Sequence, residues 1–222
     1  MIDSKLALVC LSGGLDSTVS LYWSLKKYER VEAVFFDYGQ KALNSEKKTV
    51  EALCYKLSLQ CHKVTLDFVS QFSNSSLNKV KKNLPHDVDL YSQEETLKSA
   101  KSVWVPNRNG LFINAAACLL ESKGGGDLIL GFNLEEAETF PDNSKEFLDA
   151  SNKSLEFSTQ GRVKLVSPTL SMTKKEIYKL GLELGFEPKL VWPCYVSGDQ
   201  TCGACESCLR FYRAKKEVEG IK

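Results

Sequence analysis

Short apolar runs alternate with longer amphipathic segments along most of the chain. The first run, Leu6–Leu11, is continuously apolar, as expected for a strand buried on both faces. Further strands are predicted at residues 31–36, 62–66, 127–132 and 163–166. Helical patterns between them predict helices at residues 18–25, 44–57, 109–121, about 144–156 and 173–185. This alternation predicts an α/β fold with a Rossmann-like parallel sheet and helices on both faces.

Two segments fit this plan poorly. Residues 67–100 are polar with little periodicity, and a connection this long in a compact domain is commonly a lid or a disordered segment. We therefore assign residues 67–104 to a lid or substrate loop within a main domain over residues 1–190. The tail after Trp192 is too short to form a hydrophobic core of its own, so it needs an additional cross-link to hold its structure. Residues 191–222 are predicted to form a small C-terminal element, with a helix from near Cys205.

Composition and charge narrow the function classes. The chain has 222 residues, of which 43% are hydrophobic and 26% charged, which is ordinary for a globular protein. With 29 basic and 28 acidic residues, the net charge of +1 argues against binding nucleic acid by bulk positive charge. No apolar stretch is long enough to span a membrane, and the N-terminus lacks the pattern of a secretory signal. We expect a cytoplasmic protein.

The turn after the first strand carries the most informative residues, Ser12-Gly-Gly-Leu-Asp-Ser-Thr18. Gly13 and Gly14 let backbone N–H groups approach an anion closely, and the helix that follows adds its N-terminal partial charge. Asp16 could hold Mg²⁺ beside phosphate oxygens. The string lacks the ending of a Walker A loop and the spacing of a dinucleotide-binding loop. It favours a phosphate site; the alternative is a turn that only connects strand to helix.

Four of the eight cysteines are clustered near the C-terminus, at Cys194, Cys202, Cys205 and Cys208. In a reducing compartment this clustering favours a metal over disulfides. Four thiolates suit a tetrahedral structural Zn²⁺, although the run of Cys-x₂-Cys spacings also suits a [4Fe–4S] cluster. The other four cysteines, Cys10, Cys54, Cys61 and Cys118, are expected to act as small apolar side chains.

The end of the second predicted strand supports a nucleotide site. Phe36-Asp37-Tyr38-Gly39-Gln40 falls at the carboxyl edge of the sheet, where open α/β sheets bind ligands. Asp37 could contact Mg²⁺ or a ribose, and Tyr38 or Phe36 could stack near adenine. For the two aromatic residues, packing in the core is the alternative.

The loop from Ser12 to Ser17 resembles the pyrophosphate loop of the N-type ATP pyrophosphatases, which split ATP while adenylating a substrate oxygen. The chain as a whole closely resembles the 7-cyano-7-deazaguanine synthase (QueC) family of queuosine biosynthesis. The resemblance rests on residues 12–17, 37–40, 105–109 and 140–142 and on the four-cysteine tail, which occur in that order. It implies an adenine nucleotide alpha hydrolase-like fold, structural zinc and a homodimer.

The implied reaction is an ATP-dependent ligation that turns 7-carboxy-7-deazaguanine and ammonia into the 7-nitrile, through an adenylated carboxylate and an amide. Mg²⁺ would accompany ATP. By carry-over from the family, the substrate would contact Asn107, Arg108, Asn109, Glu138, Phe140 and Asp142. The ATP site would contain Leu11, Ser12, Gly13, Gly14, Leu15, Asp16, Ser17, Thr18, Val19, Ser20, Leu21, Asp37, Tyr38, Gln40 and Lys174. For Arg108 the alternative is a surface salt bridge, and for Lys174 a solvated lysine.

Two departures from the family pattern concern the acceptor. Lys41-Ala42 replaces a common basic residue and histidine, and residues 136–142 differ from the usual loop. Glu135, Glu136 and Glu138 would add acid beside the base pocket, where a carboxylate could accept hydrogen bonds from a guanine-type N1–H and amine. Rival predictions are a tRNA thiolase or another amide ligase with the same loop, and a non-catalytic zinc module.

Overall fold

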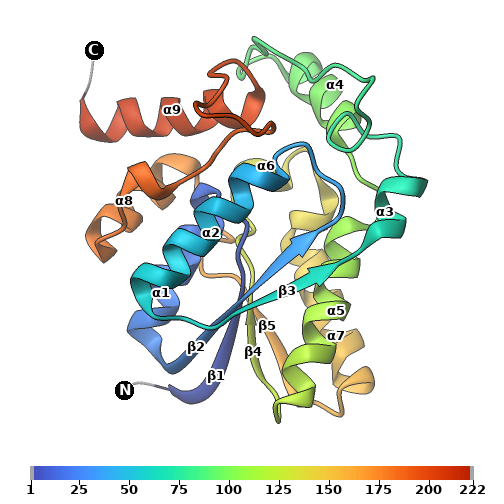
Figure 1. The fold of residues 1–222 in the computed structure, drawn as a ribbon, viewed down its shortest axis with the longest axis vertical. Coiled ribbons are helices and arrows are strands. Elements are labelled where there is room, and N and C mark those ends of the chain that lie inside the picture. Colours follow the sequence, from blue (N-terminus) through green and yellow to red (C-terminus); the bar gives the residue numbers. More distant parts are fainter. Residues whose placement is uncertain (1–2, 221–222) are drawn as a thin grey trace.

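A five-stranded parallel sheet forms the centre of the molecule (Figure 1), with the strands in the order β3-β2-β1-β4-β5. This computed structural model describes residues 3–220. The strands are β1 (Asp3–Cys10), β2 (Tyr28–Asp37), β3 (Cys61–Thr65), β4 (Gly126–Ile129) and β5 (Val163–Val166). All four neighbouring pairs are parallel. The predicted α/β fold is thus confirmed, and all five predicted strands are present.

Helices cover both faces of the sheet, which explains why its strands are so apolar. Along β1, Ala7 and Val9 pack into one core cluster, while Leu6 and Leu8 pack into the other. The first cluster also receives side chains from α1 (Leu15–Lys27), α2 (Leu43–Leu57), α8 (Lys174–Leu184) and α9 (Glu206–Glu219). The second receives them from α5 (Arg108–Ser122) and α7 (Lys145–Ser158). Alternate side chains of one strand therefore enter two separate cores.

Local capping signals in the sequence work as expected. Thr173 caps α8 with both hydrogen bonds of a capping box, and Gly185 ends that helix with φ +85°. The expectation that all four remaining cysteines are core residues is wrong for Cys118, which is exposed. It lies on the outer face of α5, whereas Ala116, Ala117 and Leu120 of that helix are buried.

Two helices that the sequence analysis missed lie between β3 and α5. They are α3 (Asp67–Phe72) and α4 (Gln93–Val103), and residues 73–92 between them have no helix or strand. Val69, Leu77, Val103 and Val105 form a small third cluster with Tyr38. This cluster ties the segment to the end of β2. Its apolar residues are too sparse in the sequence to show a helical period.

The C-terminal element packs closely against the rest of the chain. The Trp192 N–H donates to the Gly13 carbonyl at 2.8 Å, beside the loop after β1. Phe211 and Ala214 of α9 are buried in the first core cluster with α8. Shorter elements complete the fold: α6 (Leu134–Ala137) and two 3₁₀ turns at Pro141–Asn143 and Pro188–Leu190.

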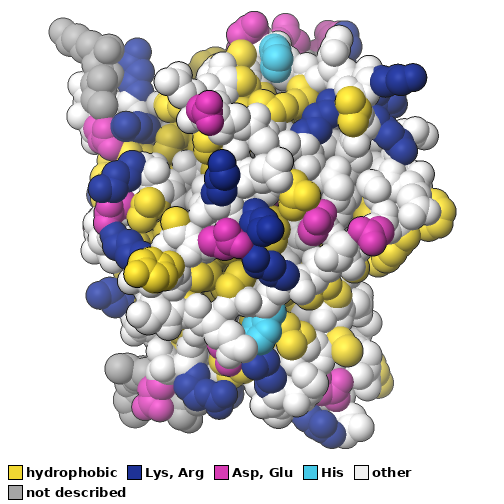
Figure 2. Space-filling model, in the orientation of Figure 1, with side chains coloured by type: hydrophobic (Ala, Val, Ile, Leu, Met, Phe, Trp, Pro, Cys, Tyr) yellow, Lys and Arg dark blue, Asp and Glu magenta, His cyan; other side chains and the backbone are white. Residues whose placement is uncertain are grey.

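The molecular surface carries both signs of charge. On the face shown in Figure 2, Lys and Arg side chains are interspersed with Asp and Glu. This mixture matches the balance of 29 basic and 28 acidic residues in the sequence. Within residues 3–220, none of the helices combines the length and apolar character needed to cross a bilayer.

Candidate active site and metal centre

The strand order reverses between β1 and β4, and in open α/β sheets ligands bind at the carboxyl ends of such neighbouring strands. The loop after β1 is held there by close backbone packing. Gly13 has φ +80°, and a Cβ on it would lie 2.7 Å from Thr49 Cγ2. A Cβ on Gly131, just after β4, would lie 2.9 Å from the Ser17 N atom. Both positions therefore require glycine.

Hydroxyl groups brace the same loop. The Ser17 hydroxyl donates to the Gly14 carbonyl at 3.2 Å and accepts from the Ser12 N–H at 3.2 Å. Gly14 is the N-cap of α1, and no side chain caps this end of the helix. The N-terminus of α1, with its partial positive charge, thus meets the loop that the sequence analysis selected as a phosphate site.

A cavity of about 260 Å³ lies at this edge of the sheet. Twelve of the residues predicted to bind ATP or substrate line it, from both ends of the chain. They are Leu11, Ser12, Gly14, Asp16, Ser17, Tyr38, Gln40, Arg108, Asn109, Phe140, Asp142 and Lys174. The structure therefore brings the phosphate loop, the end of β2, the start of α5 and the start of α8 to one place.

Nine predicted site residues do not line the cavity. Six of them come from the loop and α1: Gly13, Leu15, Thr18, Val19, Ser20 and Leu21. Leu15, Val19 and Leu21 point into the first core cluster, so the continuous run from Leu11 to Leu21 was too broad a prediction. Of the remaining three, Asp37 accepts the Gly39 N–H at 3.1 Å, and Asn107 and Glu138 are exposed.

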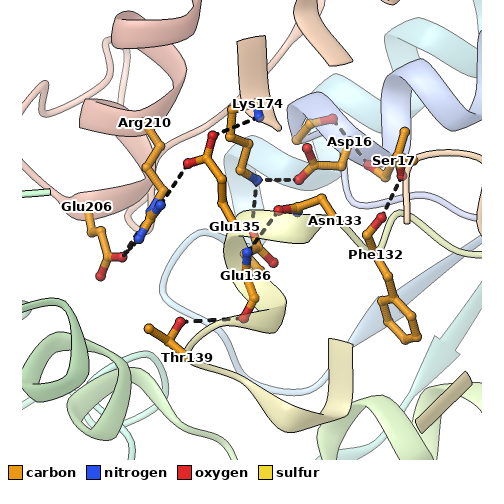
Figure 3. A network of polar contacts seen from close by, with 12 residues as sticks. Asp16, Ser17, Phe132, Asn133, Glu135, Glu136, Thr139, Lys174, Glu206 and Arg210 are labelled. Carbon is orange, nitrogen blue, oxygen red and sulfur yellow. Dashed lines mark hydrogen bonds and ion pairs between the residues drawn. The ribbon is translucent and has the colours of Figure 1, made fainter. Parts of the chain in front are cut away.

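Lys174 forms the centre of a buried ion network (Figure 3). Its ammonium group lies 2.5 Å from Asp16 Oδ2 and 2.6 Å from Glu136 Oε1. Burial alone would lower the pKa of Lys174, but the two carboxylates raise it above its ordinary value. Lys174 is only 6% exposed, so the alternative of a solvated lysine is wrong. The side chain orders two acidic residues beside the phosphate loop.

One carboxylate oxygen of Asp16 forms no hydrogen bond with the described residues. Burial raises its pKa to about 6, although Lys174 acts in the opposite direction. Asp16 Oδ1 is buried and has no hydrogen-bond donor among the described residues. A buried carboxylate oxygen without a partner is costly, and a hard cation or a ligand donor would satisfy it. The residue therefore fits the predicted role of holding Mg²⁺.

The acidic loop at Glu135–Glu138 does something other than the sequence analysis expected. Glu135 accepts the Lys174 backbone N–H and the Arg210 guanidinium, both at 2.8 Å, and also contacts Arg213. Glu136 is bound to Lys174. Burial would raise the pKa of both carboxyls, but these partners lower it. Neither carboxylate is available to a base, because each is committed to a cation of the protein.

Tyr38 and Arg108 meet on the other side of the cavity. The guanidinium carbon of Arg108 lies 5.8 Å from the centre of the Tyr38 ring and 5.9 Å from that of Phe112, in cation–π range. Arg108 Nη1 also donates to the Tyr38 hydroxyl at 3.5 Å. Among the described residues Arg108 has no salt bridge, so the alternative of a surface ion pair is wrong. Most of its donors stay free for an anionic ligand.

Glu46, in the first turn of α2, is a cavity residue that the sequence analysis missed. Its carboxylate accepts from the Gln40 side-chain amide at 2.8 Å. Burial raises the pKa of Glu46 to about 7. The residue belongs to a polar helix start with no recognisable motif. Only its position six residues after Gln40, the last residue of the strand-end segment, connects it with the site in the sequence.

The four predicted metal ligands come together. The Sγ atoms of Cys194, Cys202, Cys205 and Cys208 all lie within 4.8 Å of one another. Backbone N–H groups also point at sulfur, from Cys205 to Cys202 Sγ at 3.3 Å and from Cys202 to Cys194 Sγ at 3.4 Å. At about 2.3 Å from a tetrahedral zinc, sulfurs lie about 3.8 Å apart. The cluster can therefore hold a single metal ion.

The family comparison decides the identity. The sequence profile of the family described as "Queuosine biosynthesis protein QueC" matches residues 6–219. This chain belongs to the QueC family. A QueC relative named 7-cyano-7-deazaguanine synthase, from Carboxydothermus hydrogenoformans, is 46% identical over 94% of this chain and 97% of its own length. Another of that name, from Bdellovibrio bacteriovorus, is 44% identical over 96% of this chain and 94% of its own.

Solved structures support the fold of this QueC protein. The U34-tRNA thiolase NcsA from Methanococcus maripaludis, solved with its [4Fe–4S] cluster, aligns with a TM-score of 0.51. The alignment covers 99% of this chain and 74% of the thiolase, at 15% sequence identity. At that identity the likeness shows a shared fold alone, and it says nothing about the chemistry of this chain.

Proposed function

We propose that this protein is an ATP-dependent carbon–nitrogen ligase. It converts 7-carboxy-7-deazaguanine and ammonia into 7-cyano-7-deazaguanine, through an adenylated carboxylate and an amide. The observation that carries the proposal is the 46% identity, over 94% of the chain, to a relative named 7-cyano-7-deazaguanine synthase. The cavity supports it, because a phosphate loop and an arginine with free donors face the same space.

ATP solves a leaving-group problem in this reaction. A carboxylate resists attack because oxide would have to leave, whereas adenylation makes AMP the leaving group. Negative charge builds on pyrophosphate as it departs, and the loop and the N-terminus of α1 would stabilise that charge. Ser12, Gly14, Asp16 and Ser17 are the loop residues that line the cavity and would bind the phosphates.

Arg108 would bind the carboxylate of the substrate. Its planar fork of donors matches a carboxylate, and among the described residues only Tyr38 and Asn109 accept hydrogen bonds from it. After ammonia has formed the amide, a second ATP would activate the amide oxygen. Loss of that oxygen with AMP, and of two protons from nitrogen, gives the nitrile.

Two metals would assist, with different roles. Mg²⁺ bound with ATP would neutralise phosphate charge, and Asp16 would hold it through the oxygen that lacks a partner. Zn²⁺ held by Cys194, Cys202, Cys205 and Cys208 would staple the C-terminal element. Zinc is favoured over a [4Fe–4S] cluster because such a cluster binds each cysteine to a different iron, which spreads the sulfurs farther apart than 4.8 Å. We further propose a cytoplasmic homodimer that acts on a free base, without nucleic acid or membrane partners.

Isotope exchange between pyrophosphate and ATP tests the first half-reaction. We expect exchange that requires 7-carboxy-7-deazaguanine and Mg²⁺ but not ammonium, with AMP and nitrile formed only when ammonium is added. No exchange with this acid would overturn the proposal. Tight, salt-sensitive binding of tRNA in its place would favour a thiolase.

A further inference from the structure

Unlike Asp16 and Glu136, the cavity residues Glu46 and Asp142 form no ion pair with any described residue. Asp16 and Glu136 share Lys174. Glu46 Oε2 accepts from the neutral side-chain amide of Gln40, and no Lys, Arg or His of the described residues lies within ion-pairing distance of it. A carboxylate in this position gains from any small cation that enters the cavity.

Gln40 holds the carboxylate in place. The Gln40 carbonyl oxygen accepts the Tyr38 N–H at 3.0 Å, and its amide nitrogen donates to the Phe36 carbonyl at 3.0 Å and to Glu46 at 2.8 Å. The amide cannot rotate without breaking all three bonds, so it presents a donor to Glu46 at all times. One carboxylate oxygen is thereby fixed by Gln40, and no hydrogen bond to the other is found among the described residues.

The groups that act on Glu46 set its basicity. Burial raises its pKa to about 7, while the Gln40 hydrogen bond and the positive charge of Arg108 act in the opposite direction. The remaining titratable neighbour is Tyr38, whose pKa is raised mainly by burial. An ordinary glutamate has a pKa of about 4.3 and is a poor base. Glu46 is a better one, and it is still ionised in part at neutral pH.

We propose that Glu46 is a catalytic residue that binds the ammonium ion and accepts its proton, next to the carbonyl carbon held by Arg108. The inference rests on the proposed function and adds a base to it. Ammonium requires an anion for binding and must lose a proton before its nitrogen can attack. Glu46 supplies both, and it lines the same cavity as the arginine that would hold the reacting carboxylate.

The step balances as follows. Ammonium transfers one proton to Glu46, and the lone pair of neutral ammonia forms a bond to the acyl carbon. The bond from that carbon to the AMP oxygen breaks, and its electron pair leaves with AMP. The proton that nitrogen sheds as the amide forms leaves on the AMP phosphate, and Glu46 releases its own proton to solvent.

The variant Glu46→Gln keeps the size and the acceptor for Gln40 but removes the charge. Glu51→Gln is the matched control, because Glu51 lies on the same helix, is exposed and pairs with Lys63 outside the cavity. Three rates are compared in the full-length protein: pyrophosphate–ATP exchange, amide formation with ammonium, and trapping of the acyl-adenylate by hydroxylamine. Hydroxylamine is neutral at pH 7 and needs no base to expose its lone pair.

We expect Glu46→Gln to retain exchange, showing that it folds and adenylates the acid, and to lose about 100-fold or more of the rate with ammonium. Hydroxylamine trapping should stay within a few-fold of the unsubstituted protein. In the unsubstituted protein, the rate with ammonium should fall as the pH is lowered from about 8 to 6.5, whereas the rate with hydroxylamine, which stays mostly neutral over this range, should change little. Glu51→Gln should match the unsubstituted protein throughout.

Other outcomes overturn the inference. If Glu46→Gln raises the KM for the deazaguanine acid in the exchange assay, the Glu46 carboxylate recognises the deazaguanine ring instead of ammonium. If Glu46→Gln loses pyrophosphate–ATP exchange itself, Glu46 is required for binding ATP or Mg²⁺ or for folding. An equal loss with ammonium and hydroxylamine removes the proton-transfer role. Absence of exchange in the unsubstituted protein would refute the proposed function itself and is separate from all of these results.

Discussion

The cysteine cluster (Cys194, Cys202, Cys205 and Cys208) and the Lys174 network (Asp16, Glu135, Glu136, Lys174 and Arg210) both gather ionisable groups, by different means. The cysteines come from one short stretch and converge to within 4.8 Å. In the Lys174 network, Asp16 lies 158 residues from Lys174 in sequence and Glu136 lies 38 residues from it. The network pairs its acidic groups with its own cationic side chains, whereas four neighbouring thiolates would need a cation from outside. We therefore propose that one assembly depends on a bound metal and the other on the fold.

The two assemblies are physically linked through α9. Glu206 follows the ligand Cys205 directly and accepts two hydrogen bonds from Arg210, at 2.8 and 3.0 Å. Arg210 in turn binds Glu135, which caps the N-terminus of α8 at Lys174 (Figure 3). Damage to the metal site should therefore reach the cavity, while damage at Lys174 should leave the metal in place.

The largest effect is expected from Cys205→Ser. Cys205 is fully buried, and binding of structural zinc in small sites contributes on the order of 10 kcal/mol. Even a loss of about 5 kcal/mol would lower Tm by about 10–20 °C in a chain of this size. The measurements are metal content by mass spectrometry and Tm by calorimetry. Cys118→Ser, at an exposed cysteine, is the control and should retain metal and Tm. An unchanged Tm for Cys205→Ser would mean that the cluster is not structural.

Lys174→Met tests the other side of the comparison. It leaves two acidic side chains beside the loop without their cation, and breaking a buried ion pair costs about 3–5 kcal/mol. We expect lower stability in urea and a loss of ATP turnover, but unchanged metal content. The exposed neighbour Lys175 provides the matched variant Lys175→Met, which should be neutral. Loss of metal from Lys174→Met would show that the two assemblies are not separable.

How far the sequence predicts each assembly follows from the same difference. Residues 3 to 14 positions apart cannot lie far from one another, so spacing alone identified the four cysteines. The pairing of Asp16 with Lys174 depends on α1 and α8 packing together in the first core, which no local pattern reveals. For the same reason Glu135 and Glu136 were expected to face a base, because Lys174 and Arg210 are distant in sequence.

The fold itself was largely predictable, since apolar strands and capping signals are local. Segment 67–104 was the exception. Its two helices are short and polar and are held mainly by the cluster around Tyr38, so tertiary contacts determine them. Glu46 was missed because nothing around it in the sequence marks a site. Its environment comes from Gln40, Arg108 and burial.

The free energy of unfolding should depend on pH through Asp16 of the Lys174 network, and this effect should be smaller than those of the two substitutions above. Burial raises the pKa of Asp16 to about 6, above the value of about 3.9 in the unfolded chain. Below pH 4 both states are protonated and no stability is lost. Between about pH 4 and 6 the unfolded state ionises this carboxyl while the native state keeps it protonated, so stability falls as the pH rises and levels off above about pH 6. Urea unfolding of Asp16→Asn between pH 4 and 8 should remove this term, which is on the order of 2–3 kcal/mol. If the free energies of unfolding of the unsubstituted protein and Asp16→Asn change with pH in parallel, the assignment of this pH dependence to Asp16 is contradicted.

The smallest effect is expected from Arg213→Ala, at the edge of the link between the two assemblies. Arg213 shares Glu135 with Arg210, but its side chain is 22% exposed, against 10% for Arg210. Solvent therefore screens its charge more, and Glu135 keeps Arg210 and the Lys174 N–H after the substitution. We expect a loss of about 1 kcal/mol or less in urea, with metal content and exchange rate unchanged. Arg210→Met should cost more, because it leaves both Glu206 and Glu135 short of a buried donor. Equal effects of the two substitutions would mean that Glu135, and not the path from Glu206 through Arg210, connects α9 to the cavity.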